Sequence, residues 1–160
     1  MSDSLPTEDT ELTPVDPRYK NMLRLVVVLW ALPLIAVAIA AEVAGLLPLG
    51  VVIVPVALLL GWTILRLPLR RYNARGYTMG TDRLRTVRGL LFRSDTVVPF
   101  GRVQHLDVHQ GPLERAFGLA TLVLHTAGNH NASVAQPGLR HDDAIAMREA
   151  IRGHIKRQTL

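Results

Sequence analysis

The sequence contains no cysteine, only two lysines and few aromatic residues. Without cysteine, disulfide bonds and thiolate chemistry are excluded. Aromatic side chains make up 5% of the chain, and Phe100 and Phe117 fit a protein core better than a platform for stacking bases. The composition therefore argues against nucleic acid as a partner.

Charge is segregated along the chain. Residues 1–17 hold five acids and no lysine or arginine, whereas the rest carries eighteen bases and eight acids, a net charge of +10. A basic surface of this kind is typical of proteins that meet nucleic acid or an anionic membrane. Prolines alternate with serine and threonine in the acidic leader, which predicts a disordered acidic tail over residues 1–20.

Two long apolar runs follow the leader. Leu25–Ala41 contains no polar side chain, and Leu46–Leu65 contains only Thr63. A helix needs roughly 20 apolar residues to cross the hydrocarbon core of a bilayer. Because only Glu42–Gly45 separates the runs, we expect a tight turn between two transmembrane helices, forming a hairpin over residues 21–71.

Basic residues flank both apolar runs and predict their orientation. The turn between the runs has Glu42 and no base. The positive-inside rule then places both termini in the cytoplasm and makes this a multi-pass protein of the cytoplasmic membrane. The flanking bases are Arg18, Lys20 and Arg24 before the first run and Arg66, Arg70, Arg71 and Arg75 after the second.

Residues 72–160 predict a mainly-β domain that ends in one helix. Six or seven short strand-like runs alternate with glycine-containing turns, as in an antiparallel barrel or sandwich. In the last segment, Ala144, Met147, Ile151 and Ile155 recur at helical spacing, and Asp142 or Asp143 is the expected N-cap. We expect this amphipathic helix to close one end of the barrel.

Histidines alternate with an aspartate in the run VQHLDVH, which invites a metal-site interpretation. Strand alternation puts His105, Asp107 and His109 on one face together with Val103. The two imidazoles would stand about 13 Å apart, so one ion cannot reach both. A metal would need a ligand from a neighbouring strand, and a polar strand face is the favoured interpretation.

The next run, GPLERAFGLA, has a purely structural interpretation. Pro112 can start a short helix, and Leu113 and Phe117 lie four residues apart and point together into the core. Gly118 can end the helix in a left-handed conformation. We expect Leu122 and Leu124 to form the inward face of the following strand.

The run VPFGRVQHLDVHQGPLERAFGLATLVLHTAG, followed by PGL and DDAIAMREAI, resembles the bacterial pleckstrin-homology (PH)-like family of membrane proteins, often called YdbS-like. The resemblance covers Leu25 to about Ile155. It implies two N-terminal spans, a basic junction and a cytoplasmic split β-barrel, residues 72–160, capped by a C-terminal α-helix. The resemblance assigns no catalytic role and no ligand to any residue of this sequence. We therefore expect a protein that is not an enzyme and has no cofactor.

Three functions compete on this basis. The first is a membrane-anchored binding or scaffolding module that acts through a membrane or cytoplasmic protein partner. The second is recognition of anionic lipid headgroups by basic residues at the membrane surface. A metal-dependent enzyme built on His105, Asp107, His109 and His125 is less favoured, and the oligomeric state stays open. The candidates for lipid contact are Arg70, Arg71, Arg75, Arg83, Arg85 and Arg88.

Overall fold

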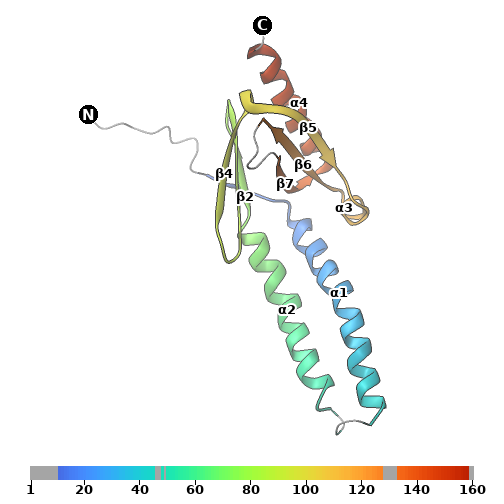
Figure 1. Ribbon diagram of the computed structural model, residues 1–160. Helices are drawn as coiled ribbons and strands as arrows, with labels where there is room; N and C mark the ends of the chain where they lie inside the picture. The colour runs from blue at the N-terminus through green and yellow to red at the C-terminus, as the bar shows by residue number, and fades with distance from the viewer. Residues whose placement is uncertain (1–10, 46–47, 49, 128–132, 159–160) are drawn as a thin grey trace, which may run out of the picture.

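The computed structural model describes residues 11–45, 48, 50–127 and 133–158. It consists of a long helical hairpin with a β-rich domain at one end (Figure 1). The chain enters the hairpin from the side of the domain and returns to it, so both helices begin or end beside the domain. The fold agrees with the predicted helical hairpin followed by a β domain.

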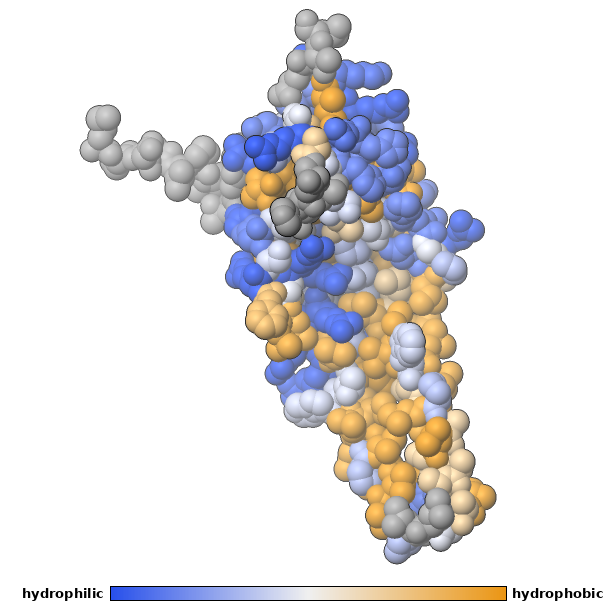
Figure 2. Space-filling model, viewed as in Figure 1, coloured by the Kyte–Doolittle hydropathy of each residue, from blue (hydrophilic) through white to orange (hydrophobic). Residues whose placement is uncertain are grey.

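The hairpin consists of α1 (Pro17–Val43) and α2 (Ile53–Asn73). Pro17 starts α1, and the Asp16 carboxylate accepts a hydrogen bond from the Arg18 backbone N–H at 2.8 Å, which caps the helix. Both helices are long and apolar enough to cross a membrane. Their side chains form a continuous apolar surface below the domain (Figure 2).

The connection between the spans is longer than predicted. The expected turn at Glu42–Gly45 with a second helix from Leu46 is wrong, because α1 ends at Val43 and α2 begins only at Ile53. Gly50 has a φ of +89°, a left-handed conformation that a helix does not contain. The Gly50 backbone N–H donates to the Glu42 carboxylate, which ties the connection to the end of α1.

The second half of the predicted tail is ordered. Thr13–Pro14 form strand β1, and α1 starts at Pro17, so the predicted disorder over 1–20 is wrong for residues 12–20. The reason is apolar burial: Val15 is 1% exposed and Tyr19 is 5% exposed. Residues 1–10 lie outside the described residues, and their disorder stays a prediction.

The domain consists of two antiparallel sheets and a helix. One sheet has the order β1-β2-β3-β4, with β2 (Gly76–Met79), β3 (Arg83–Arg88) and β4 (Ser94–Pro99). A short 3-10 helix, η2 (Phe100–Arg102), leads to the second sheet, whose order is β5-β6-β7. Its strands are β5 (Val103–His109), β6 (Leu119–Thr126) and β7 (Ser133–Arg140), and α4 (His141–Gln158) follows.

The core lies between the two sheets and α4. Leu84 of β3, Leu122 and Leu124 of β6, and Ala144 and Ile151 of α4 are all completely buried in one cluster. The predicted inward faces of β6 and α4 are therefore confirmed. The predicted N-cap is wrong by two or three residues, since α4 begins at His141 and both aspartates lie in its first turn, where their charge still favours the helix.

A second cluster joins the domain to α1. Its buried members come from the chain just before α1, from the first turns of α1 and from the start of β6: Val15, Tyr19, Met22 and Leu119. Leu113 and Phe117 of α3 (Pro112–Phe117) pack against this cluster, so the expectation that they point into the barrel core is wrong. Gly118 ends α3 with a φ of +68°, as predicted.

Gly138 tests the importance of this junction for stability. It has a φ of +76°, its carbonyl accepts the Asp16 N–H at 2.8 Å, and a Cβ there would lie 3.0 Å from both Val15 and Tyr19. Gly138→Ala should lower the free energy of unfolding by about 2 kcal/mol through strain and overpacking. The melting temperature of the full chain in detergent measures this.

Gly153→Ala is the matched control. Gly153 lies inside α4, and apart from the helix's own backbone no atom lies within 4 Å of the position that a Cβ would take. The same substitution should therefore raise the stability there by up to about 1 kcal/mol. Equal shifts of the melting temperature for both variants would contradict the role of the junction.

Candidate functional site

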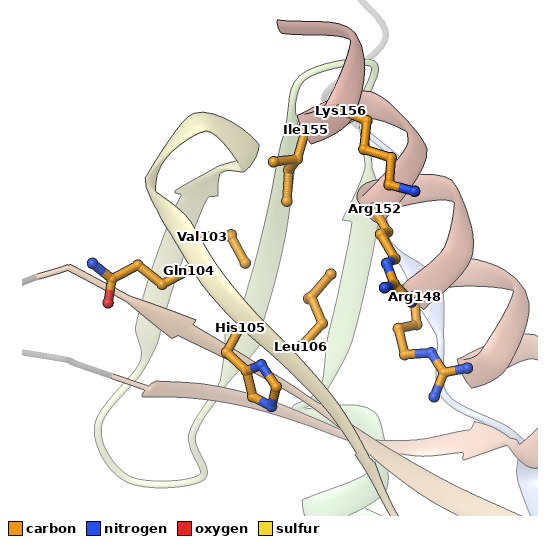
Figure 3. Close-up of a pocket in the computed structure, with 8 residues that line it drawn as sticks. All are labelled: Val103, Gln104, His105, Leu106, Arg148, Arg152, Ile155 and Lys156. Carbon is orange, nitrogen blue, oxygen red and sulfur yellow. The ribbon is translucent and has the colours of Figure 1, made fainter. Parts of the chain in front are cut away.

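A groove of about 440 Å³ runs between β5 and α4 (Figure 3). Val103 and Leu106 of β5 and Ile155 of α4 are its apolar side chains. In Figure 1, the start of β5 and the C-terminal turns of α4 lie at the end of the domain away from the spans. The groove therefore opens on the side of the domain that is remote from the helical hairpin.

One wall of the groove is basic. Arg148, Arg152 and Lys156 lie four residues apart on α4, which places them in one row along the helix. Arg148 pairs with its neighbour Glu149 at 2.8 Å. Within the described residues, no acidic side chain lies within ion-pair distance of Arg152 or Lys156. The wall is therefore suited to an anionic ligand.

The strand beside the groove is an edge strand. The sheet order β5-β6-β7 leaves β5 paired on one side only. The free side of an edge strand can bind an extended peptide through backbone hydrogen bonds. An apolar floor, a basic wall and an edge strand together fit an extended peptide with acidic side chains.

A β-bulge near the start of β5 changes the predicted faces. The register shifts between Val103 and His105, so Val103 is buried at 7% exposure while Gln104 is exposed. The expectation that Val103 shares a face with His105 is wrong, because the extra residue of a bulge reverses the alternation. The bulge turns Val103 toward the groove floor and the core.

The predicted histidine face gathers around Asp107. One oxygen of its carboxylate lies 2.9 Å from His105 Nε2, and the other lies 3.3 Å from Nε2 of His125, the cross-strand partner of His105. His109 lies opposite Thr121, farther along the strand. Across the part of the chain that the structure describes, no group of three histidine or acidic side chains is arranged to hold a metal ion.

The six predicted lipid-contact arginines do not form one surface. Arg70 and Arg71 are exposed at the C-terminal end of α2, and Arg88 is exposed at the end of β3 nearest to it. Arg75 instead belongs to the junction: its guanidinium lies 5.2 Å from the Tyr19 ring centroid and donates a hydrogen bond to the Tyr19 hydroxyl.

The remaining two arginines, Arg83 and Arg85, pair with acids. Arg85 binds Asp95 across the β3–β4 pair, with its Nε 3.0 Å and its Nη2 2.5 Å from carboxylate oxygens, and Arg83 binds Asp82 at 2.8 Å. Since Gly76 lies opposite Val87, Arg83 is at the end of β3 away from α2. At about 3.3 Å per residue it lies roughly 16 Å beyond Arg88, about two Debye lengths.

The basic wall of α4 was missed among the candidate residues. Arg148, Arg152 and Lys156 recur every four residues in MREAIRGHIK, and this spacing was available in the sequence. What the sequence does not reveal is that this row faces β5, because that depends on how α4 packs across the sheets.

Comparison with known proteins gives a family, a curated relative and a solved structure to which this chain is similar. The bacterial PH domain family matches residues 14–155, both spans included. Transmembrane protein YdbS of Bacillus subtilis (strain 168) is 29% identical over 89 residues, 56% of this chain and 54% of YdbS, so the match spans about half of that relative. A crystal structure of a protein with a pleckstrin-homology domain from Shewanella loihica is 17% identical, with a TM-score of 0.40, covering 53% of this chain and 74% of that one.

A double-mutant cycle on Arg85 and Asp95 would measure the interaction energy with which Asp95 holds the Arg85 side chain. The hydrogen bonds from Arg85 hold the pKa of Asp95 below its ordinary value of 3.8. The pair therefore stabilises the domain above that ordinary pKa and loses its contribution as the pH falls through the lower folded-state value.

Because the pair is exposed, we expect a coupling energy below about 1 kcal/mol between Arg85→Gln and Asp95→Asn. Asp95→Asn should also reduce the loss of stability below about pH 4. Melting temperatures of the four proteins at several pH values measure both effects. An unchanged acid dependence in Asp95→Asn would contradict the assignment.

Proposed function

Because the chain belongs to the bacterial PH domain family, we propose that it is a membrane-associated PH-like module that binds a partner protein rather than catalysing a reaction. Its hairpin anchors the domain, and the groove between β5 and α4 receives an extended acidic segment of the partner. The family and the two spans support the anchored domain. The position and charge of the groove support the binding of an acidic partner segment.

The observation that carries the proposal is the location of the groove. The C-terminal turns of α4, which carry Arg152 and Lys156 of its basic wall, lie at the end of the domain remote from the spans (Figure 1). Electrostatic attraction to a membrane surface falls off within about 8 Å at physiological ionic strength. Cations at the remote end are thus better placed for an acidic protein than for the bilayer that holds the hairpin.

The basic flanks of the spans support a cytoplasmic domain. Arg66, Arg70 and Arg71 follow the apolar part of α2 directly, and Glu42 is the acidic residue at the opposite end of the hairpin. By the positive-inside rule, this distribution supports the proposal that the domain and both ends of the hairpin are cytoplasmic.

Photocrosslinking in native membranes tests the groove. A photoreactive residue replaces Arg148, which lines the groove, or Arg157, which lies on the same helix outside it. We expect a discrete protein adduct at position 148. Adding Arg152→Glu and Lys156→Glu should reduce its yield at least about tenfold, since like charges across an interface cost more than 1.4 kcal/mol.

Position 157 is the control for non-specific capture. Arg157 is exposed and its guanidinium donates to the Gly153 carbonyl on α4 at 3.2 Å. Equal adducts at both positions, or an adduct at 148 that persists after the charge reversals, would refute binding in the groove.

A second candidate function is recognition of anionic lipid headgroups. It is favoured by the exposed arginines near the end of α2, where Arg70, Arg71 and Arg88 are joined by Arg93, which directly precedes β4. Each base near an anionic surface contributes about 1 kcal/mol. Arg83 and Arg85 lie farther away and pair with acids, so they contribute less.

Lipid enrichment in mixed-lipid nanodiscs tests this candidate. Arg88→Gln and Arg93→Gln should each lower the enrichment of phosphatidylglycerol around the full chain about fivefold, as expected for 1 kcal/mol. The matched pair Arg83→Gln and Arg85→Gln should change it little. Equal effects of the two pairs, or no enrichment by the unmodified chain, would exclude this function.

A further inference from the structure

The turn between β3 and β4 carries the most exposed apolar side chains of the domain. Leu91 and Phe92 are each 88% exposed, and Leu90 is 40% exposed. Comparable exposure elsewhere in the described chain occurs on the spans, as at Val43 with 83%. In water such a patch is unfavourable, so these side chains require a cover.

Strand register places this turn at the membrane end of the domain. β2 starts three residues after α2 and leads away from it, and β3 returns beside β2 with Val87 opposite Gly76. Residues 89–93 therefore extend past Gly76 toward the spans. A surface hollow is lined by Asn73 and Ala74 on one side and by Gly89 and Arg93 on the other, which places the turn next to the end of α2.

The figures show the same arrangement. The β3–β4 turn, which directly precedes β4, reaches down beside the C-terminal turns of α2 (Figure 1). In the space-filling view, apolar side chains gather at this corner of the domain, with hydrophilic side chains beside them and the apolar spans below (Figure 2).

The backbone of the turn and its charged flanks suit an interface. Gly89 has a φ of +127°, and a Cβ there would lie 1.8 Å from the Phe92 carbonyl oxygen, so the tight turn needs glycine. Arg88 and Arg93 flank the three apolar residues and are exposed. Arginines can keep their guanidinium groups among headgroups while neighbouring apolar side chains enter the acyl region.

We propose that the β3–β4 turn, residues 89–93, inserts Leu91 and Phe92 into the same bilayer that the hairpin crosses. The turn is then a third membrane contact beside the two spans, and it fixes the face that the domain presents to the membrane. This contact is apolar and does not depend on a particular headgroup. It is independent of partner binding in the groove.

Site-directed labelling tests the insertion directly, because the chain has no native cysteine. The full chain carrying Leu91→Cys is spin-labelled and reconstituted alone into phosphatidylcholine vesicles. Thr81→Cys is the matched control, since Thr81 is exposed in the β2–β3 turn at the opposite end of the same sheet. Collision rates are measured with oxygen, which concentrates in lipid, and with a water-soluble nickel complex.

We expect the label at position 91 to collide mainly with oxygen and the label at position 81 mainly with the nickel complex. The ratio of the oxygen to the nickel collision rate should therefore be high at position 91 and low at position 81. A label at position 91 that is as accessible to nickel as the one at position 81 would overturn the proposal and leave a protein as the cover of the turn.

The lipid composition distinguishes insertion from headgroup recognition. Insertion through Leu91 and Phe92 should persist in vesicles of phosphatidylcholine alone. Protection of position 91 that appears only after phosphatidylglycerol is added would also overturn the proposal, because the contact would then depend on the arginines.

Discussion

The burial of Tyr19 and its neighbours holds the β domain against the hairpin, and the remaining surfaces take their positions from this contact. Val15, Tyr19 and Met22 enter one cluster with Leu119, and the Arg75 guanidinium covers the Tyr19 ring. These side chains come from both sides of the hairpin and from the domain. Rotation of the domain about the short link after α2 would expose them to water, which the hydrophobic effect opposes.

With the domain held in this way, its two ends face different surroundings. One end carries the exposed apolar turn between β3 and β4 together with Arg88 and Arg93, next to the end of α2. The other end carries the groove with Arg152 and Lys156. Screening within about 8 Å separates the two sets of charges, so one end can contact the bilayer while the other stays available to a protein.

The role of each basic residue depends on the side chains that it contacts as well as on its position. Arg85 pairs with Asp95 and Arg83 pairs with Asp82, so both arginines form ion pairs on the surface of the first sheet. Arg75 serves the junction through Tyr19. The charge of +10 on residues 18–160 is therefore spread over structural pairs, membrane flanks and the groove, and total charge alone is a poor guide to the binding site.

The sequence by itself determined the elements whose signal is local. Long apolar runs predicted the spans, helical spacing predicted the buried face of α4, and Gly118 predicted the end of α3. Tertiary structure alone decided which distant segments meet. Three features depend on long-range contacts or backbone irregularities. They are the start of α2 at Ile53, the bulge that buries Val103, and the packing of Leu113 and Phe117 against the cluster at α1. The groove follows the same rule, because a row of bases on a helix becomes a site only when packing sets it beside an edge strand.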